Sequence, residues 1–285
     1  MAVFKELVFF NRLSKDHAMP RLVAAPMCLE QTISYSLSGW QLFLFCVVLP
    51  VLLSLTGLWI ARRIIPSHYL NQNHDVTGPF FSTLGTVYGI FLAFIVSTTW
   101  QAFSTTQSNL VQEARFLGNI YFTTNAFPEP VRGNLQHLLL EYRDSLIKGE
   151  WQTMERGESN PKTSELLKKI GYAYMNYRVT DPAVEPFLQE SIHMLSAMTG
   201  LRASRIDDSS SGLLPVLWCV LLLGAVATVG FSFLFEARNF KAQAVMTILL
   251  TGVISMTFFT IINLDFPFTG VTTISPEPIE HLEMK

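Results

Sequence analysis

Small and hydroxylated residues recur at helical spacing within one long uncharged stretch of this chain. Between residues 82 and 103 no Asp, Glu, Lys or Arg occurs, and a stripe runs at steps of three or four residues: Ser82, Thr86, Gly89, Ala93 and Ser97. In a membrane such a stripe either lets two helices approach closely or lines a water-filled pore. Helix contact is the commoner role, so both interpretations stay open for these candidate pore-lining residues.

Three aromatic residues of the same segment suggest a second element of a channel. Tyr88, Phe91 and Phe94 could narrow a pore to an apolar constriction, which blocks ions when it loses its water. Aromatic residues in a membrane helix more often pack in the core or face lipid. The constriction is therefore an alternative to ordinary packing.

Glu113 and Arg205 are the charged residues best placed to interact beside the membrane. Glu113 lies on the expected helical extension of residues 82–103, and Arg205 lies shortly before the next uncharged stretch. Both face the same compartment. We predict a juxtamembrane ion pair between them, with a structural role.

The sequence carries no motif of a catalytic or metal centre. HExxH, GxSxG and the P-loop are absent, the six histidines are dispersed, and the three cysteines form no CxxC pair. A net charge of −2 gives no basis for nucleic-acid binding. We therefore predict a non-enzymatic protein without a metal, another cofactor or a nucleic-acid partner.

The composition and the placement of charge predict an all-α membrane protein. Hydrophobic residues make up 49% of the 285 residues and charged residues only 15%, whereas soluble domains carry about 25% charged residues. A helix needs roughly 20 apolar residues to cross a bilayer, and lipid favours helices because their backbone groups pair internally. Four uncharged windows meet that length: 40–61, 82–103, 213–235 and 242–264. Pro50 predicts a kink in the first window, and Gly78-Pro79 predicts a break before the second.

Residues 104–212 predict a helical extramembrane insert between the second and third transmembrane helices. They carry more than half of the charged residues of the chain, and apolar residues recur in them at helical steps. Breakers divide the insert into three or four amphipathic helices. The first continues the second span without interruption, and the last starts at an Asp181 N-cap. The expected segments are an N-terminal tail or interfacial helix 1–39, a first transmembrane pair 40–103, the insert 104–212, a second transmembrane pair 213–264 and a C-terminal tail 265–285.

With four spans, both termini and the insert lie in one compartment and the two short loops lie in the other. The short loops carry their basic residues within a few positions of a span: Arg62, Arg63, Arg238 and Lys241. Positive charges in such places favour the cytoplasm, although the basic N-terminal tail argues the other way. On balance we expect the insert and the termini to be extracytoplasmic.

Several segments of the chain also match a known family pattern. They are Gly85–Trp100 (GTVYGIFLAFIVSTTW), Gln112–Arg115, Glu150–Met154 and Leu214–Trp218. The most specific segment follows the last span, where an acid, a proline–phenylalanine pair and a glycine stand at Asp265, Pro267, Phe268 and Gly270. Over about residues 40–275 the chain resembles the bestrophin-like membrane domain family of bacterial proteins.

The resemblance implies four spans with a helical insert after the second, in the cytoplasmic (inner) membrane of a bacterium. The family is named for a distant likeness to bestrophins, which are pentameric anion channels. A homo-oligomer and inorganic anions are therefore the implied partners, besides membrane lipids. Our first hypothesis is an oligomeric bestrophin-like ion channel. The alternative is a non-conducting, membrane-anchored helical protein whose insert binds a partner or lipid.

Overall fold

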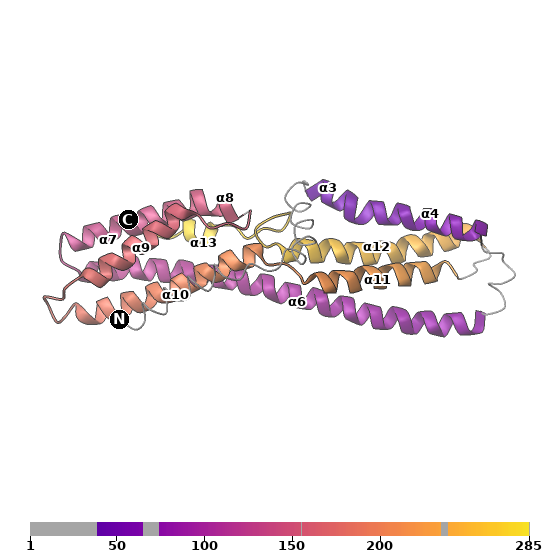
Figure 1. The fold of residues 1–285 in the computed structure, drawn as a ribbon, viewed down its shortest axis with the longest axis horizontal. Coiled ribbons are helices and arrows are strands. Elements are labelled where there is room, and N and C mark those ends of the chain that lie inside the picture. The colour runs from indigo at the N-terminus through magenta and orange to yellow at the C-terminus, as the bar shows by residue number, and fades with distance from the viewer. Residues whose placement is uncertain (1–38, 65–73, 155, 235–238, 285) are drawn as a thin grey trace.

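The computed structural model describes residues 39–64, 74–154, 156–234 and 239–284, all of which form helices, turns or irregular segments. The predicted N-terminal tail or interfacial helix lies outside these residues, except for Gly39. The molecule is elongated, and helices pack side by side along its length in two halves (Figure 1). One half is apolar and the other carries most of the charged residues, as the sequence predicts.

A single helix, α6 (His74–Thr123), runs through both halves and ends in a 3-10 turn, η2 (Thr124–Ala126) (Figure 1). The sequence contains no breaker between the membrane segment and Thr123, so nothing stops the helix at the bilayer surface. This confirms that the second span continues into the insert. Because α6 is one rigid element, it connects the membrane half physically to the insert.

The membrane half contains the four helices that are long and apolar enough to cross a bilayer: Gly39–Ile64, Gly78–Ala126, Pro215–Ser232 and Phe240–Asp265. Only the second of them, part of α6, continues into the insert, and the other three end near the membrane segment. The first is built from α3 (Gly39–Phe43), the π-helical turn η1 (Leu44–Val48) and α4 (Leu49–Ile64), and the last two are α11 (Pro215–Ser232) and α12 (Phe240–Asp265). The helix α12 lies between α4 and α6 and contacts both. The prediction of four spans is confirmed.

Pro50 and Pro79 affect their helices differently from the kink and the break that the sequence predicts. The turn before Pro50 widens into the π-helical η1, because proline lacks an N–H and its ring crowds the carbonyl four residues earlier. The break predicted at Gly78-Pro79 is wrong, since α6 begins at His74 and Pro79 lies inside it. Pro79 is the sixth residue of α6, where it removes one backbone hydrogen bond, and the helix continues on both sides of it.

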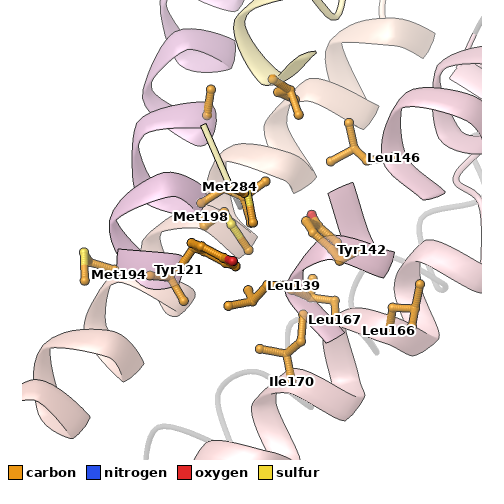
Figure 2. Close-up of a cluster of buried hydrophobic side chains, with 14 of the residues drawn as sticks. Tyr121, Leu139, Tyr142, Leu146, Leu166, Leu167, Ile170, Met194, Met198 and Met284 are labelled. Atoms are coloured by element: carbon orange, nitrogen blue, oxygen red, sulfur yellow. The ribbon is translucent and has the colours of Figure 1, made fainter. Parts of the chain in front are cut away.

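The insert packs short helices against the outer half of α6. They are α7 (Val131–Ser145), the π-helical turn η3 (Leu146–Glu150), α8 (Trp151–Met154), α9 (Pro161–Asn176) and α10 (Glu185–Ser210). Figure 2 shows their core, where Tyr121 of α6, Leu139 and Tyr142 of α7, and Met198 of α10 point toward one another. The helix α10 packs along α6 over much of its length.

The predicted N-cap at Asp181 is displaced. Asp181 Oδ1 accepts a hydrogen bond from the Ala183 N–H at 2.9 Å, but residues 181–184 form a turn and α10 begins at Glu185. A second proline, Pro186, occupies the first turn of α10, and a proline at that position suits a helix start. The sequence therefore offered two compatible starts, and the chain uses the later one.

The C-terminal segment folds back over the insert. Phe266 and Phe268 are buried, and α13 (Glu277–Glu280) packs against α6. Met284 reaches the core beside Met198 (Figure 2). The residues that follow the last span therefore belong to the insert half rather than to a free tail.

Candidate functional site

The stripe on α6 faces away from the rest of the chain. Ser82, Thr86, Gly89, Ala93 and Ser97 are all exposed. A Cβ atom added at Gly85 or Gly89 would meet no atom of another residue within 4 Å. Among the described residues of one chain, no other helix therefore packs closely against these two glycines. The stripe is left open to lipid, to water or to a second copy.

The exposed surfaces of the other spans are chemically different. On α11 and α12 the large exposed hydrophobic side chains are aliphatic or Met, apart from Phe240 at the start of α12: Val216, Val220, Leu222, Leu223, Val226, Val245, Met246, Ile248, Leu249, Val253 and Met256. Such side chains suit lipid tails. The exposed side of α6 also includes Val87, Ile90 and Phe94, but these lie beside the hydroxylated stripe, not within it. The helix α6 therefore carries a lipid-like flank beside a continuous stripe of small and hydroxylated residues.

The hydroxyls of the stripe remain compatible with an aqueous surface. Thr86 Oγ1 donates to the Ser82 carbonyl oxygen at 2.7 Å, which satisfies the donor within the helix. The hydroxyl oxygen still has lone pairs to accept hydrogen bonds from water. The small side chains of the stripe leave space beside α6, and their hydroxyl dipoles make this surface weakly polar without adding charge.

The three aromatic residues do not share one surface. Tyr88 is buried, donates its hydroxyl to the Leu221 carbonyl oxygen at 2.8 Å, and lies against Gly224, where an added Cβ would overlap its ring. Phe91 is partly buried beside the same cluster, whereas Phe94 is 64% exposed. Consecutive residues turn by about 100° around a helix, so Tyr88 and Phe94 point to different sides of α6. A constriction built from all three within one face does not fit this geometry.

The polar face of α6 continues beyond the membrane segment. A surface groove of about 340 Å³ is lined by Ser104, Gln107, Ser108, Val111, Gln112 and Arg115. All six residues come from α6, so the described part of the chain supplies one wall of the groove. This side of α6 is therefore an open surface in the described part of a single chain.

On the opposite side of α6, Glu113 enters a buried charge network. Arg205 Nε lies 2.7 Å from Glu113 Oε2, and Arg205 Nη2 lies 3.0 Å from Glu113 Oε1. The structure thus brings together the two residues that the sequence pairs. Arg205 Nη2 also lies 3.0 Å from Glu150 Oε1, and Arg202 binds Glu150 from the other side. The network joins α6, η3 and α10.

All four charges of this network are buried: Glu113, Glu150, Arg202 and Arg205. Burial alone would lower the pKa of Arg205, but the carboxylates of Glu113 and Glu150 outweigh that effect and raise its pKa above the usual range. Two carboxylates and two guanidinium groups balance in charge. Removing one partner would leave an uncompensated buried charge, which is costly.

Sequence reasoning missed Glu150 and Arg202. Glu150 stands in the family-like segment Glu150–Met154, but a charged residue next to a tryptophan gives no local sign of full burial. Its partner is distant in the sequence, and both side chains become buried only when α10 packs on η3. Tertiary packing, not helical periodicity, places them together.

The family-like C-terminal motif anchors the end of α12. Asp265 Oδ2 accepts a hydrogen bond from the Leu213 N–H at 2.8 Å, just before α11 begins. The Pro267 carbonyl oxygen accepts one from the Ile274 N–H at 2.8 Å. Gly270 has φ +86°, a backbone conformation that favours glycine. Phe268 packs edge-on against Trp151 of α8, with ring centroids 5.7 Å apart. Phe266 and Phe268 are both buried inside the chain.

Metal binding receives no support from the geometry. Within the described residues, no three His, Cys, Asp or Glu side chains gather in a group able to hold a metal ion.

The comparisons with known proteins identify a family pattern over most of the chain. A family model described as the Bestrophin-like domain matches residues 48–279. A crystal structure of a membrane protein carrying one substitution is similar in fold, with a TM-score of 0.59 and 14% identity, covering 83% of this chain and 97% of the other. A bacterial bestrophin homologue from Klebsiella pneumoniae, also with a mutation, gives a TM-score of 0.55 at 14% identity, covering 83% and 98%. No curated protein matches the chain.

Proposed function

Since the chain belongs to the Bestrophin-like family, we propose that it assembles with copies of itself into an ion channel for inorganic anions, with α6 as the pore helix. One observation carries this proposal. The exposed stripe of α6 is small and hydroxylated, whereas most of the large exposed side chains of α11 and α12 are aliphatic or Met. A ring of copies would turn the stripes inward and leave the apolar faces to lipid.

The continuity of α6 supports the same arrangement. Its polar face extends from Ser82 to Arg115, past the end of the apolar segment. Ions leaving the membrane segment would therefore meet a polar surface on the same helix. The groove around Arg115 has only one wall within the described chain, and a neighbouring copy would supply the other.

Conductance of the purified protein in planar bilayers tests the proposal, together with the mass of the detergent-solubilised complex. We expect a ring-sized oligomer with ion conductance. Ser97→Phe should reduce the conductance because a ring of bulky side chains narrows the pore. Val226→Phe, on an exposed apolar position of α11, is the control and should leave the conductance unchanged. A monomer with silent bilayers would refute the channel.

A second function rests on a different surface of the insert. A groove lies between the start of α7 and the end of α9, and its lining includes Val131, Asn134, Ala173 and Tyr177. The buried hydroxyl of Tyr177 has no hydrogen-bond partner among the described residues. This favours a non-conducting, membrane-anchored protein whose insert binds a partner or lipid.

Ala173→Trp tests that second function because it fills the groove without touching α6. A protein that binds a partner there should lose the partner. If the protein is a channel, the same variant should conduct normally. Loss of a bound partner with Ala173→Trp would support the second function, and unchanged conductance would support the channel.

For the orientation in the bacterial inner membrane, we keep the hypothesis that the short loops are cytoplasmic. It rests on the positive charges beside the spans, Arg62 and Arg63 at the end of α4 and Lys241 at the start of α12, because such charges favour the cytoplasmic side. Alkaline phosphatase fused to the C-terminus should be active. A fluorescent C-terminal fusion of green fluorescent protein would place the insert in the cytoplasm instead.

A further inference from the structure

Two charged residues on α6, two positions apart, meet opposite surroundings. Glu113 points into the insert and is paired with Arg205. Arg115 is exposed, and it forms no ion pair with any residue that the structure describes. Between residues 78 and 123 these are the only Asp, Glu, Lys or Arg residues of the helix. Since Glu113 is neutralised by Arg205, Arg115 is the charge on this stretch of α6 that no described residue compensates.

Arg115 lies on the same side of α6 as the hydroxylated stripe. From Ser97 the helical steps lead through Ser104, Ser108 and Val111 to Arg115, at intervals of three, four or seven residues, which return to one face of a helix. The groove joins these residues into one surface. The neighbours of the guanidinium there are hydroxyl, amide and aliphatic groups, and no carboxylate lines the groove.

The packing of α6 keeps this side open. Thr106, on the other side of the helix, donates to Asp208 Oδ2 of α10 at 2.7 Å, and Leu110 and Leu117 are buried in the core. Arg115 therefore has a fixed direction, because the helix that carries it is held from behind by α10. Its guanidinium cannot turn to the acidic residues of α10 without breaking that packing.

We infer that Arg115 sets the preference of the conduction path for anions over cations, an inference that rests on the proposed channel function. In a ring of copies, one such guanidinium from each chain would form a ring of positive charge at the mouth of the membrane segment. Rings of charged side chains select ions of opposite sign and concentrate them locally. The hydroxyls of the stripe are too weakly polar to do so alone.

Reversal potentials across a KCl gradient in planar bilayers test this role. Arg115→Gln should lower the chloride-to-potassium permeability ratio by about tenfold, since a ring of charges contributes several small attractions at once. Arg115→Glu should invert the preference, and Arg115→Lys should keep it because the charge remains. Lys168→Gln is the matched control. Lys168 is an exposed cation of α9 that does not line the groove between α7 and α9, and its loss should leave the ratio unchanged.

The outcomes separate this inference from the channel itself. If Arg115→Gln and Arg115→Glu conduct with the selectivity of the natural protein, the inference is wrong and the channel stands. If Arg115→Gln no longer forms the oligomer in a mass measurement, the guanidinium belongs to the contact between copies, which also overturns the inference. A natural protein that forms no conductance at all would refute the proposed function, and this role of Arg115 with it.

Discussion

The membrane half and the insert half of this molecule are stabilised in different ways. The insert has an extensive core of fully buried residues and a buried network of four charges. In the membrane spans only 11% to 28% of the residues are buried inside the chain, so most of their surface must meet lipid or other copies. The insert is thus a self-contained helical unit, whereas the membrane half is an open layer of helices.

The same contrast occurs around α6 itself. One face carries Leu110, Glu113 and Leu117 into the insert core, and the other carries Ser97 and Arg115 outward. A helix with one face fully packed and another both polar and open has a structural side and a side free for function. Substitutions on the two faces should therefore differ sharply in their effect on folding.

The largest effect is expected where the buried charges would be unbalanced. Arg205→Ala should destabilise the protein by about 3–5 kcal/mol, because it leaves Glu113 and Glu150 buried without their shared partner. Chemical unfolding in detergent, followed by tryptophan fluorescence, measures the change. Arg132→Ala, which removes an exposed pair with Glu129, is the control and should leave the free energy of unfolding nearly unchanged, because water screens exposed pairs. Equal losses in the two variants would contradict the described burial.

A core substitution gives the next largest difference between the halves. Leu139 is fully buried in the insert, so Leu139→Ala should cost about 2–5 kcal/mol through lost contacts and a cavity. Leu223 on α11 is 70% exposed, and Leu223→Ala should change the free energy of unfolding by less than about 0.5 kcal/mol. The same unfolding assay compares them. A larger loss at Leu223 would mean that another copy covers this face of α11.

Two glycines of the membrane half, Gly224 and Gly89, should respond differently to substitution by alanine. Gly224→Ala should destabilise by about 1–3 kcal/mol, because the new methyl group meets the ring of Tyr88. Gly89→Ala meets no neighbour within the chain and should leave the unfolding of the monomer unchanged or slightly improved, since alanine favours helices. Loss of the oligomer with Gly89→Ala, seen by mass, would show that copies touch at this glycine rather than line a pore there.

The smallest expected effect is a pH dependence where α10 meets α6. Burial raises the pKa of Asp208 above its usual value, although the hydrogen bond from Thr106 partly opposes this. A raised pKa in the folded state means that Asp208 stabilises the fold most at acid pH. This contribution is lost as the pH rises above about 4, through the carboxyl range. Asp208→Asn should remove this dependence in unfolding curves at several pH values. An unchanged pH profile would contradict the shift.

The sequence predicted best what depends on local pattern. Uncharged windows reveal the spans, and the lack of a breaker after Trp100 reveals the continuous α6. The Gly78-Pro79 break failed because a proline near a helix start is tolerated. The burial of Phe266 and Phe268 could not be predicted, because no local pattern shows that the chain turns back at Gly270 into the insert.

The candidate site could be predicted only in part for the same reason. Helical spacing placed Ser82 through Ser97 on one face and suggested the Glu113–Arg205 pair. It did not reveal that Tyr88 turns toward α11, since that depends on the close approach allowed by Gly224. Nor did it reveal Glu150 and Arg202, whose burial arises from contacts between segments distant in the sequence.

The accessibility of position 97 to water tests the central claim most directly. In a protein whose three cysteines are replaced by serine, Ser97→Cys and Val226→Cys are each treated with a negatively charged thiol reagent during bilayer recording. In the proposed channel the polar face of α6 lines the pore, so the reagent should modify Ser97→Cys and reduce the current, while Val226→Cys stays unmodified in lipid. Modification of Val226→Cys with an inert Ser97→Cys would contradict the account.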